Sequence, residues 1–243
     1  MNSMTDVLRN SGELRRSGEY DLTFYWSGED VPVSRRYELA FAFDEIASTI
    51  WGLPADFFRK VGPDLFSERD RVVVLSRQDK VIGFSVSRRL MVGDQPVLFR
   101  RYSCMYAADR GYGLYSALTA PVLEHEIAQK PGTLFLAWRT RNPVVWFKNA
   151  AMCRRVAPDL RDGRADSELT ELALAVCRAV YPKAEVDPVT LTVNSVYPGN
   201  TGYQVQPRHP LPELDAIFMA HPGMESRHNA LFGIGEIKSA PTR

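Results

Sequence analysis

The residues best suited to chemistry in this chain of 243 residues stand around two closely spaced glycines. In the stretch "AADRGYGLYSAL", Arg110 precedes Gly111 and Gly113, and the apolar spacing changes there from strand-like to helical. A helix N-terminus presents main-chain N–H groups and the positive end of the helix dipole, and both attract an anion. Glycines let a phosphate approach those amides, and Arg110 adds a cation. The stretch therefore predicts a binding site for a diphosphate.

The two glycines can also have a purely structural role. A turn from strand to helix can need glycine for its backbone conformation alone. The common nucleotide-binding motifs do not fit, because no Gly-Lys-Ser/Thr follows and the dinucleotide fingerprint needs a third glycine inside a βαβ unit. The three runs before the turn instead indicate an antiparallel meander. A nucleotide-binding domain is therefore not favoured.

The elements that must position this turn alternate along the chain. Period-2 hydrophobicity and β-rich runs predict strands at 20–26, 71–77, 80–92, 96–106, 133–140, 189–196 and 230–237. Helical spacing and capping residues predict helices at 34–53, 54–61, 113–129, 142–152, 166–182 and 211–221. Ser34 is the expected N-cap of the first helix, and Asn142 with Pro143 is the expected start of the fourth.

The order of these elements, together with the turn, resembles the GNAT superfamily of acyl-CoA-dependent N-acyltransferases. The family signature is Arg/Gln-x-x-Gly-x-Gly/Ala at the start of the third helix. Arg110 and Gly113 match it, whereas Tyr115 stands where the family has Gly or Ala. The resemblance covers roughly residues 20–157. It implies an α/β (α+β) fold with a mixed, mostly antiparallel central sheet flanked by helices.

The resemblance also implies a substrate, namely acetyl-CoA or another acyl-CoA, and no metal. In such proteins the strand before the turn splays from the next strand, here 133–140, and pantetheine lies in the cleft between them. The diphosphate sits on the amides of the turn. The residues that the resemblance implies for cofactor binding are Met105, Tyr106, Arg110, Gly111, Tyr112, Gly113, Leu114, Tyr115 and Asn142.

Acyl transfer to an amine needs a neutral nucleophile, a polarised thioester carbonyl and a proton for the departing thiolate. Related enzymes often use a glutamate on the splayed strand and a tyrosine early in the fourth helix. Here that strand has no glutamate, and the helix offers Trp146 and Phe147. Tyr102, Tyr106 and Glu45 are therefore the catalytic candidates. Their structural alternatives are packing in the strand and the solvated face of a helix, where Asp44 is also expected.

The remaining reactive residues of the chain have simple structural roles. Cys104 lies in a predicted buried strand and is expected to be a core thiol rather than a nucleophile. Glu124, His125 and Glu126 diverge around a helix, so we expect a solvated face and no metal site. His209, His221 and His228 match no metal-ligand spacing. Four arginines of one hairpin form either a basic patch for an anion or the wet edge of the sheet. These arginines are Arg88, Arg89, Arg100 and Arg101.

Composition limits the class of protein. Thirty Lys and Arg residues against 29 Asp and Glu residues leave no global field that would steer the chain to nucleic acid or to an anionic membrane. Three cysteines without paired spacing argue against disulfides and zinc. No apolar run approaches membrane-spanning length, and the amino terminus lacks a signal-peptide pattern. We expect a cytoplasmic protein.

The expected organisation has three parts. Residues 1–19 form a polar N-terminal segment, and residues 20–157 form the GNAT-like acyl-CoA-binding core. Residues 158–243 form a C-terminal helix-strand extension that packs on the core sheet or extends it. We expect this extension to act as a lid or pocket wall, because a strand pair of this size would struggle to fold alone.

The favoured function is an N-acyltransferase that moves an acyl group, acetyl being expected, from acyl-CoA to the amine of a small molecule in a ternary complex. One alternative is a catalytically degenerate GNAT-like binding protein, since Tyr115 and the missing glutamate and tyrosine depart from the family. Another is a synthase of N-acyl amino acids or related signals, whose acyl carrier protein the hairpin arginines would dock. A homodimer also stays open.

Overall fold

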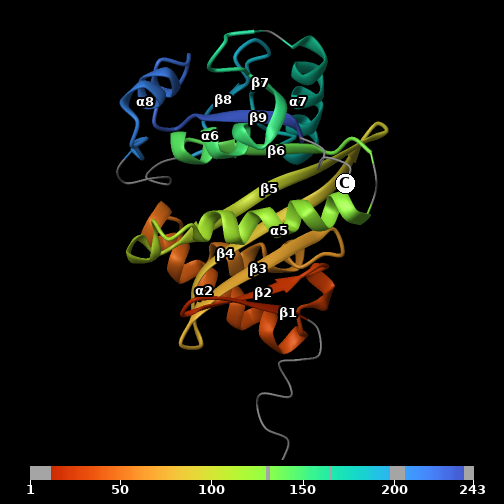
Figure 1. The fold of residues 1–243 in the computed structure, drawn as a ribbon, viewed down its shortest axis with the longest axis vertical. Helices are drawn as coiled ribbons and strands as arrows, with labels where there is room; N and C mark the ends of the chain where they lie inside the picture. Colours follow the sequence, from red (N-terminus) through yellow and green to blue (C-terminus); the bar gives the residue numbers. More distant parts are fainter. Residues whose placement is uncertain (1–11, 130–131, 165, 198–205, 238–243) are drawn as a thin grey trace, which may run out of the picture. The chain divides into compact units, whose positions relative to one another are not determined.

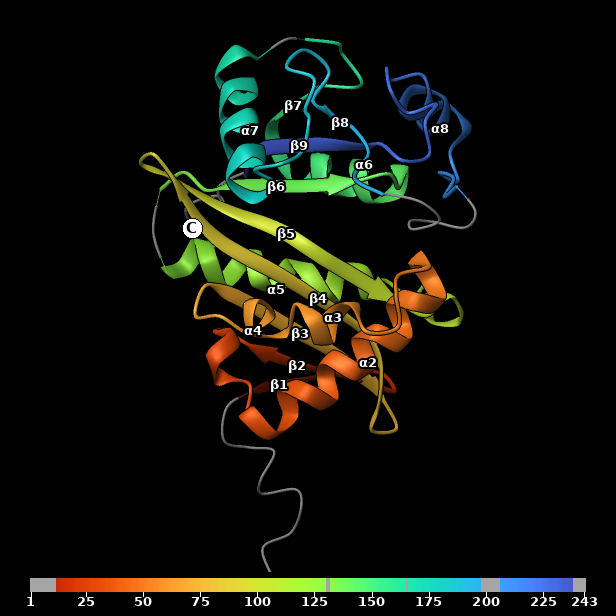
Figure 2. The same ribbon diagram turned by 180° about the vertical axis from the view of Figure 1, so that it is seen from behind.

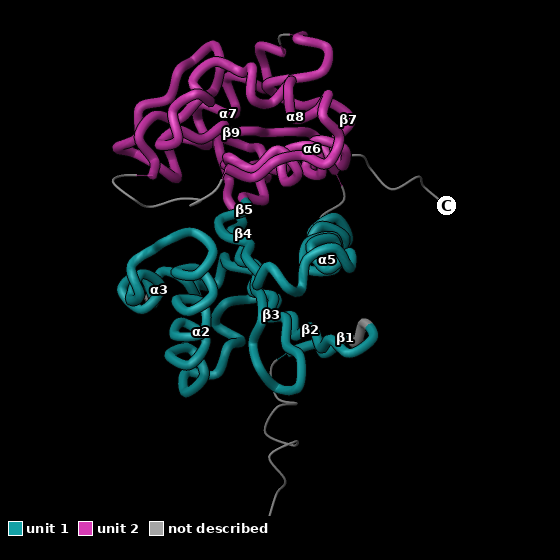
Figure 3. Tube along the Cα trace, turned by 90° about the vertical axis from the view of Figure 1, so that its left-hand side faces the viewer, with its two compact units in different colours: residues 1–89, 100–130 teal, residues 90–99, 131–243 magenta. Residues whose placement is uncertain are grey.

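The computed structural model describes residues 12–129, 132–164, 166–197 and 206–237. The chain divides into two compact units (Figure 3). Unit 1 comprises Met1–Arg89 and Arg100–Lys130, and unit 2 comprises Leu90–Phe99 and Pro131–Arg243. The tip of one hairpin thus belongs to unit 2 and its base to unit 1. The sequence suggested a boundary between core and extension after residue 157, whereas the two compact units meet at residues 89/90, 99/100 and 130/131.

Unit 1 is built on a meander of strands in the order β1-β2-β3-β4-β5. The strands are β1 Glu13–Ser17, β2 Tyr20–Tyr25, β3 Asp70–Arg77, β4 Lys80–Val92 and β5 Gln95–Met105. The pairs β1–β2, β2–β3 and β3–β4 are antiparallel. Gln78 and Asp79, which join β3 to β4, both have positive φ, as a two-residue hairpin turn requires. The predicted meander is confirmed.

Helices cover both faces of the unit 1 sheet. Helix α5 (Leu114–Gln129) crosses one face (Figure 1). Helices α2 (Val33–Trp51), α3 (Phe57–Lys60) and α4 (Gly62–Leu65) lie on the other face (Figure 2). The core beneath α2 is aromatic: Phe43 stacks on Phe84 with ring centroids 3.9 Å apart, and Phe58 meets Phe84 edge-on. Two short 3-10 helices, Gly28–Asp30 and Ala107–Asp109, complete the unit.

Unit 2 contains the tip of the β4–β5 hairpin and four further strands. They are β6 Phe135–Thr140, β7 Cys153–Ala157, β8 Thr192–Val193 and β9 Ala230–Ile237. Strand β9 lies between β6 and β7 and pairs antiparallel with both, while β8 pairs with the start of β9. The expected C-terminal extension thus returns into the sheet, and its last strand fills the place next to β6.

Alternation along β9 separates the two faces of the unit 2 sheet. Phe232 and Ile234 join a buried cluster with Leu169 of helix α7 (Ser167–Val180). Gly233 faces the opposite way, towards Trp138 of β6 and towards helix α6 (Pro143–Ala151). A Cβ on Gly233 would lie 2.6 Å from Cε2 of Trp138, and the corresponding atom on Gly235 would lie 2.4 Å from the sulfur of Cys153. Glycine is therefore required here by close packing.

The described strands and helices form the mixed, mostly antiparallel α/β (α+β) arrangement that the sequence predicted. Helix α2 begins after Pro32, which is its N-cap, so the prediction of Ser34 as the cap was wrong. Strands β1 and β7 were not predicted, because the first is a short exposed edge and the second carries two arginines. Strand β8 is shorter than predicted, and helix α8 (Pro212–Met219) is close to its predicted range. Across the described ranges, every helix is too short or too polar to pass through a bilayer.

Candidate functional site

The glycine turn joins the end of β5 to the first residue of α5, as predicted. Gly111 has φ 97° and Gly113 has φ 75°, values that side-chain-bearing residues rarely adopt. No heavy atom of the described residues beyond their own neighbours lies within 4 Å of a Cβ placed on either glycine. The backbone therefore needs glycine at both positions, and the space beside them is open.

A buried carboxylate, which no pattern in the sequence revealed, lies beside the turn. Asp109 is only 2% exposed, and its Oδ1 lies 2.9 Å from Nη1 of Arg77 at the end of β3. The contact is an ion pair rather than an aligned hydrogen bond, because this oxygen has no hydrogen-bond partner among the described residues. Tyr112 lies against Tyr20 of β2, with ring centroids 6.3 Å apart. The only signal in the sequence was a lone carboxylate beside the turn.

Arg110 stands exposed at the start of the turn. Among the described residues, no carboxylate pairs with its guanidinium group, so its charge is available to a ligand. Burial raises the pKa of the Cys104 thiol to about 12, and the positive charge of Arg110 opposes that rise only in part. Cys104 is therefore a protonated core thiol, as expected, and is poorly suited to act as a nucleophile.

Tyr115, the residue that departs from the family signature, faces the sheet. Nη1 of Arg100 on β5 donates a hydrogen bond of 3.0 Å to its hydroxyl oxygen, and Arg100 itself is only 6% exposed. Leu114 and Met105 are buried apolar residues. The side chains of these residues belong to the core. Only their main-chain groups can therefore contact a ligand at the turn.

Two of the three catalytic candidates, Tyr106 and Glu45, lie within electrostatic reach of each other. Burial raises the pKa of Tyr106, and the negative charge of Glu45 raises it further, so the hydroxyl stays protonated at neutral pH. Glu45 is exposed on α2, close enough for its charge to act on Tyr106. Tyr102 instead packs edge-on against Phe58, with ring centroids 5.0 Å apart. Both tyrosines are partly buried against the core beneath α2, and the catalytic roles of Tyr102, Tyr106 and Glu45 stay predictions.

Asp44, next to Glu45, has a structural role. It is buried, and its Oδ1 accepts a hydrogen bond of 2.6 Å from the main-chain N–H of Phe58. Its Oδ2 accepts a bond of 2.9 Å from Nε of Arg59. The carboxylate thus satisfies the first amides of α3. The expectation that Asp44 lies on a solvated helix face was wrong.

The four hairpin arginines form neither a basic patch nor a wet edge. Nη2 of Arg88 lies 2.8 Å from Oδ2 of Asp70, a fully buried carboxylate that Arg101 also contacts at 3.3 Å. Arg101 pairs in addition with Asp64 at 2.8 Å. Asp70, Arg88 and Arg101 lie on one face of the sheet, whereas Arg100 and Tyr115 lie on the other. Docking of an acyl carrier protein at this hairpin stays a prediction.

A second ion network ties α5 to the same sheet. Glu126 is 3% exposed, and its two oxygens lie 2.6 Å from Nε of Arg71 and 3.3 Å from Nε of Arg89. His125 stacks on Trp26 at 4.0 Å between ring centroids. The expectation of a solvated face at these two positions was wrong, since both side chains are engaged with the sheet.

The remaining predicted residues lie in unit 2. Oδ1 of Asn142 accepts a hydrogen bond of 2.9 Å from the N–H of Val144, which confirms it as the N-cap of α6. Its role in cofactor binding stays a prediction. His209, His221 and His228 each hydrogen-bond to main-chain atoms. Within the described ranges, no group of three or more His, Cys, Asp or Glu side chains is arranged to hold a metal ion.

No family model matches the chain, and no curated protein matches it either. One similar solved structure is a GCN5-related glucosamine N-acetyltransferase region in a fungal multi-domain GH3 beta-N-acetylglucosaminidase, at 17% identity and a TM-score of 0.37. That match covers 50% of this chain but only 14% of the fungal chain.

Two further solved structures are enzymes of more similar length. The ribosomal-protein-S18-alanine N-acetyltransferase from Escherichia coli matches at 12% identity and a TM-score of 0.43, over 91% of this chain and 97% of that one. An aminoglycoside N-acetyltransferase in complex with CoA matches at 16% identity and a TM-score of 0.42, over 57% of this chain and 90% of that one. Likenesses at these identities and TM-scores carry no information on the activity or substrate of this chain.

Proposed function

We propose that this protein is an acyl-CoA-dependent N-acyltransferase, with acetyl-CoA as the expected donor and a small-molecule amine as the acceptor. The observation that supports this most is the turn before α5. Two exposed glycines at positive φ leave open space beside the N-terminus of a 16-residue helix. Helix-terminal amides, the helix dipole and the exposed Arg110 together favour the diphosphate of coenzyme A.

The position of Tyr115 is compatible with this proposal. A large residue replaces the small residue of the family signature, but its hydroxyl accepts a hydrogen bond from Arg100. The side chain is thereby held on the sheet side of α5, and Gly111 and Gly113 keep their open side. Binding of the diphosphate then depends on main-chain amides and on Arg110 rather than on the residue at position 115.

The proposed reaction is direct transfer in a ternary complex. The amine nitrogen attacks the thioester carbonyl, the tetrahedral intermediate collapses, and the carbon–sulfur bond breaks. Tyr106, whose hydroxyl stays protonated at neutral pH, gives its proton to the departing thiolate. Glu45 accepts the proton that the amine loses. A route through an acyl-enzyme on Cys104 is disfavoured, because the pKa of that thiol is about 12.

Binding of coenzyme A is the first test. We expect isothermal titration calorimetry to show binding of coenzyme A to the wild type, and loss of binding in Gly113→Trp, whose side chain would fill the open space. Gly18→Trp is the matched control, since Gly18 also has positive φ and open surroundings but lies in the β1–β2 turn. The proposal is wrong if the wild type binds no coenzyme A at millimolar concentration, or if both variants bind equally.

Turnover is the second test, and it separates an enzyme from a degenerate binding protein. We expect thiol release from acetyl-CoA in the presence of at least one amine of a small-molecule panel. Tyr106→Phe should lower kcat by about a hundredfold with unchanged affinity for coenzyme A. Coenzyme A binding without thiol release from any amine would favour the degenerate protein, which the absence of a carboxylate on β5 also suggests.

A further inference from the structure

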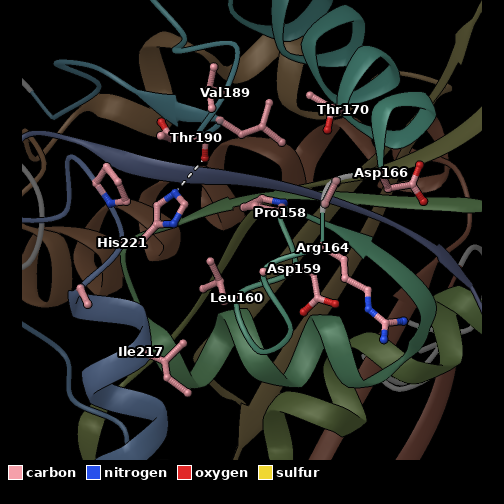
Figure 4. A pocket seen from close by; sticks show the side chains of 15 residues that line it. Pro158, Asp159, Leu160, Arg164, Asp166, Thr170, Val189, Thr190, Ile217 and His221 are labelled. Carbon is pink, nitrogen blue, oxygen red and sulfur yellow. Dashed lines mark hydrogen bonds between the residues drawn. The ribbon is translucent and has the colours of Figure 1, made fainter.

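A cavity of about 550 Å³ lies within unit 2, away from the glycine turn in the sequence. Four segments enclose it: the loop after β7, the first turns of α7, the segment before β8 and the end of α8 (Figure 4). Its volume falls in the range of small-molecule sites, which are mostly apolar with a few convergent polar groups. None of the functions considered above uses it.

The lining of this cavity is largely apolar. Pro158 and Leu160 come from the loop after β7, Val189 and Leu191 from the segment before β8, and Ile217 from α8. Figure 4 shows the side chains of Leu160 and Ile217 on the same side of the space. Such a surface suits the hydrocarbon part of a ligand.

Both carboxylates of the lining take part in contacts that hold the local backbone, Asp159 through one oxygen and Asp166 through both. Oδ1 of Asp159 accepts hydrogen bonds from the main-chain N–H groups of Arg161, at 3.0 Å, and Asp162, at 3.2 Å. Oδ1 of Asp166 caps α7, and its Oδ2 lies 3.1 Å from Nη1 of Arg155. These groups hold the loop and the helix in place, so they are less available to attract a cationic ligand.

Arg164 and His221 are two polar side chains of the lining that can bind a ligand. Arg164 is exposed at the edge of the cavity, and no carboxylate of the described residues pairs with it. Nε2 of His221 lies 2.8 Å from the main-chain oxygen of Thr190, which can only accept, so this nitrogen carries the proton. Burial lowers the pKa of His221, so the ring is neutral at pH 7 and its Nδ1 is a bare acceptor. The two side chains lie on opposite sides of the cavity in Figure 4.

We propose that this cavity binds a small organic acid that carries a hydrogen-bond donor at the end opposite its carboxylate. The carboxylate pairs with Arg164, the hydrocarbon body lies on Leu160 and Ile217, and the donor reaches Nδ1 of His221. This site goes beyond acyl transfer and does not depend on it. Its ligand differs from coenzyme A and binds within unit 2, where the charge of Arg164 and the shape of the cavity determine which acid fits.

Three probes of one chain length test this proposal on the full-length protein by calorimetry. 6-Hydroxyhexanoate has both end groups, hexanoate lacks the donor, and 6-aminohexan-1-ol replaces the carboxylate with an ammonium group. We expect 6-hydroxyhexanoate to bind most tightly, hexanoate several-fold more weakly, and the amino alcohol not at all. Equal binding of the acid and the amino alcohol, or no binding of 6-hydroxyhexanoate at millimolar concentration, would overturn the proposal.

Variants locate the binding in the cavity. Arg164→Gln should weaken binding of 6-hydroxyhexanoate by about fivefold, the size of one solvent-exposed charge contact. Arg178→Gln, an equal charge change on the exposed side of α7, is the control and should leave binding unchanged. Leu160→Trp should abolish binding by filling the space, with circular dichroism confirming the fold. Equal effects of the two arginine variants would contradict the site.

The same titration separates this proposal from the proposed acyltransferase. Gly113→Trp should bind 6-hydroxyhexanoate like the wild type, because its glycine lies in unit 1. Arg164→Gln should in turn bind coenzyme A like the wild type. Loss of 6-hydroxyhexanoate binding in Gly113→Trp with an intact fold would mean that the acid binds at the turn, and it would overturn the assignment to unit 2.

Discussion

Two Gly-x-Gly sequences in this protein have the same spacing and opposite surroundings. Gly111 and Gly113 stand in a turn, adopt positive φ and face open space. Gly233 and Gly235 stand inside β9, where a Cβ would lie 2.6 Å from Trp138 and 2.4 Å from Cys153. The space beside the first pair is open, whereas side chains of this protein fill the space beside the second pair.

This difference shows what a glycine pattern can and cannot indicate. Both pairs are needed for space, so spacing alone does not identify a binding site. What distinguishes them is the element that follows: a helix N-terminus beside an exposed arginine in one case, and a continuing strand under two tryptophans in the other. Adding atoms at the first pair should affect a ligand, whereas adding them at the second should affect folding.

The largest effect on stability is expected at Gly233 and Gly235, here called the closed pair. Gly233→Val should lower the free energy of unfolding by about 3 kcal/mol, because its branched side chain has no space beside Trp138 and Trp146. Urea denaturation followed by tryptophan fluorescence measures this. Ile234→Val, on the opposite face of the same strand, should cost about 1 kcal/mol. Equal losses in the two variants would mean that the tight contact at Gly233 is easily relieved.

The support of the open turn is the next test. Tyr115→Phe removes the hydroxyl that accepts from the buried Arg100, and should cost about 2 kcal/mol of unfolding free energy. Tyr112→Phe is the control, because Tyr112 is 69% exposed and should be nearly neutral. If Tyr115→Phe is also neutral by urea denaturation, the first turn of α5 is held without this bond.

Replacing Gly113 by alanine adds one methyl group, and it tests separately the backbone conformation and the open space that glycine provides. Gly113→Ala should cost about 1–2 kcal/mol of unfolding free energy, since alanine is strained at positive φ. It should also weaken coenzyme A binding by about tenfold, because the methyl group occupies the open side of the turn. Gly18→Ala, in the β1–β2 turn at φ 63°, should show the same strain with unchanged binding. Calorimetry that found equal affinities in both variants would remove the open turn as the ligand site.

Acid should act on the closed pair through its neighbour Glu236. Burial alone would raise the pKa of this carboxyl, but Arg155 and Arg154 outweigh it and hold the pKa below its ordinary 4.5. The ion pairs therefore stabilise the fold above pH 4.5, and this stabilisation is lost as the pH falls through the lower folded-state pKa. Glu236→Gln should cost about 1 kcal/mol at neutral pH, and the gap to the wild type should shrink in acid. Parallel stability curves from urea titrations would contradict this account.

Local signals predicted much of the fold. Asn142 with Pro143 and the β-rich run at 230–237 each act within a few residues, and the elements that they mark are where they were expected. The turn at Gly111 and Gly113 also lies between strand and helix as predicted. Its use as a coenzyme A site stays a proposal.

Distant pairings account for what the sequence did not reveal. Glu126 was expected in solvent, but its partner Arg71 lies 55 positions earlier, and no local pattern links them. The same holds for Asp44, which is bound by Phe58 and Arg59, and for Asp109 with Arg77 beneath the turn. The insertion of β9 between β6 and β7 is likewise set by strands far apart in the chain.

That insertion has a consequence during synthesis. Translation delivers β6 and β7 long before Ala230–Ile237, so both strands leave the ribosome with an unpaired edge towards the missing neighbour. Strands β1 to β5, in contrast, pair with neighbours that are adjacent in the sequence, so they need no later strand to pair with one another. A nascent chain stalled before residue 230 would carry one finished half and one half whose open edges attract chaperones or other unfinished copies.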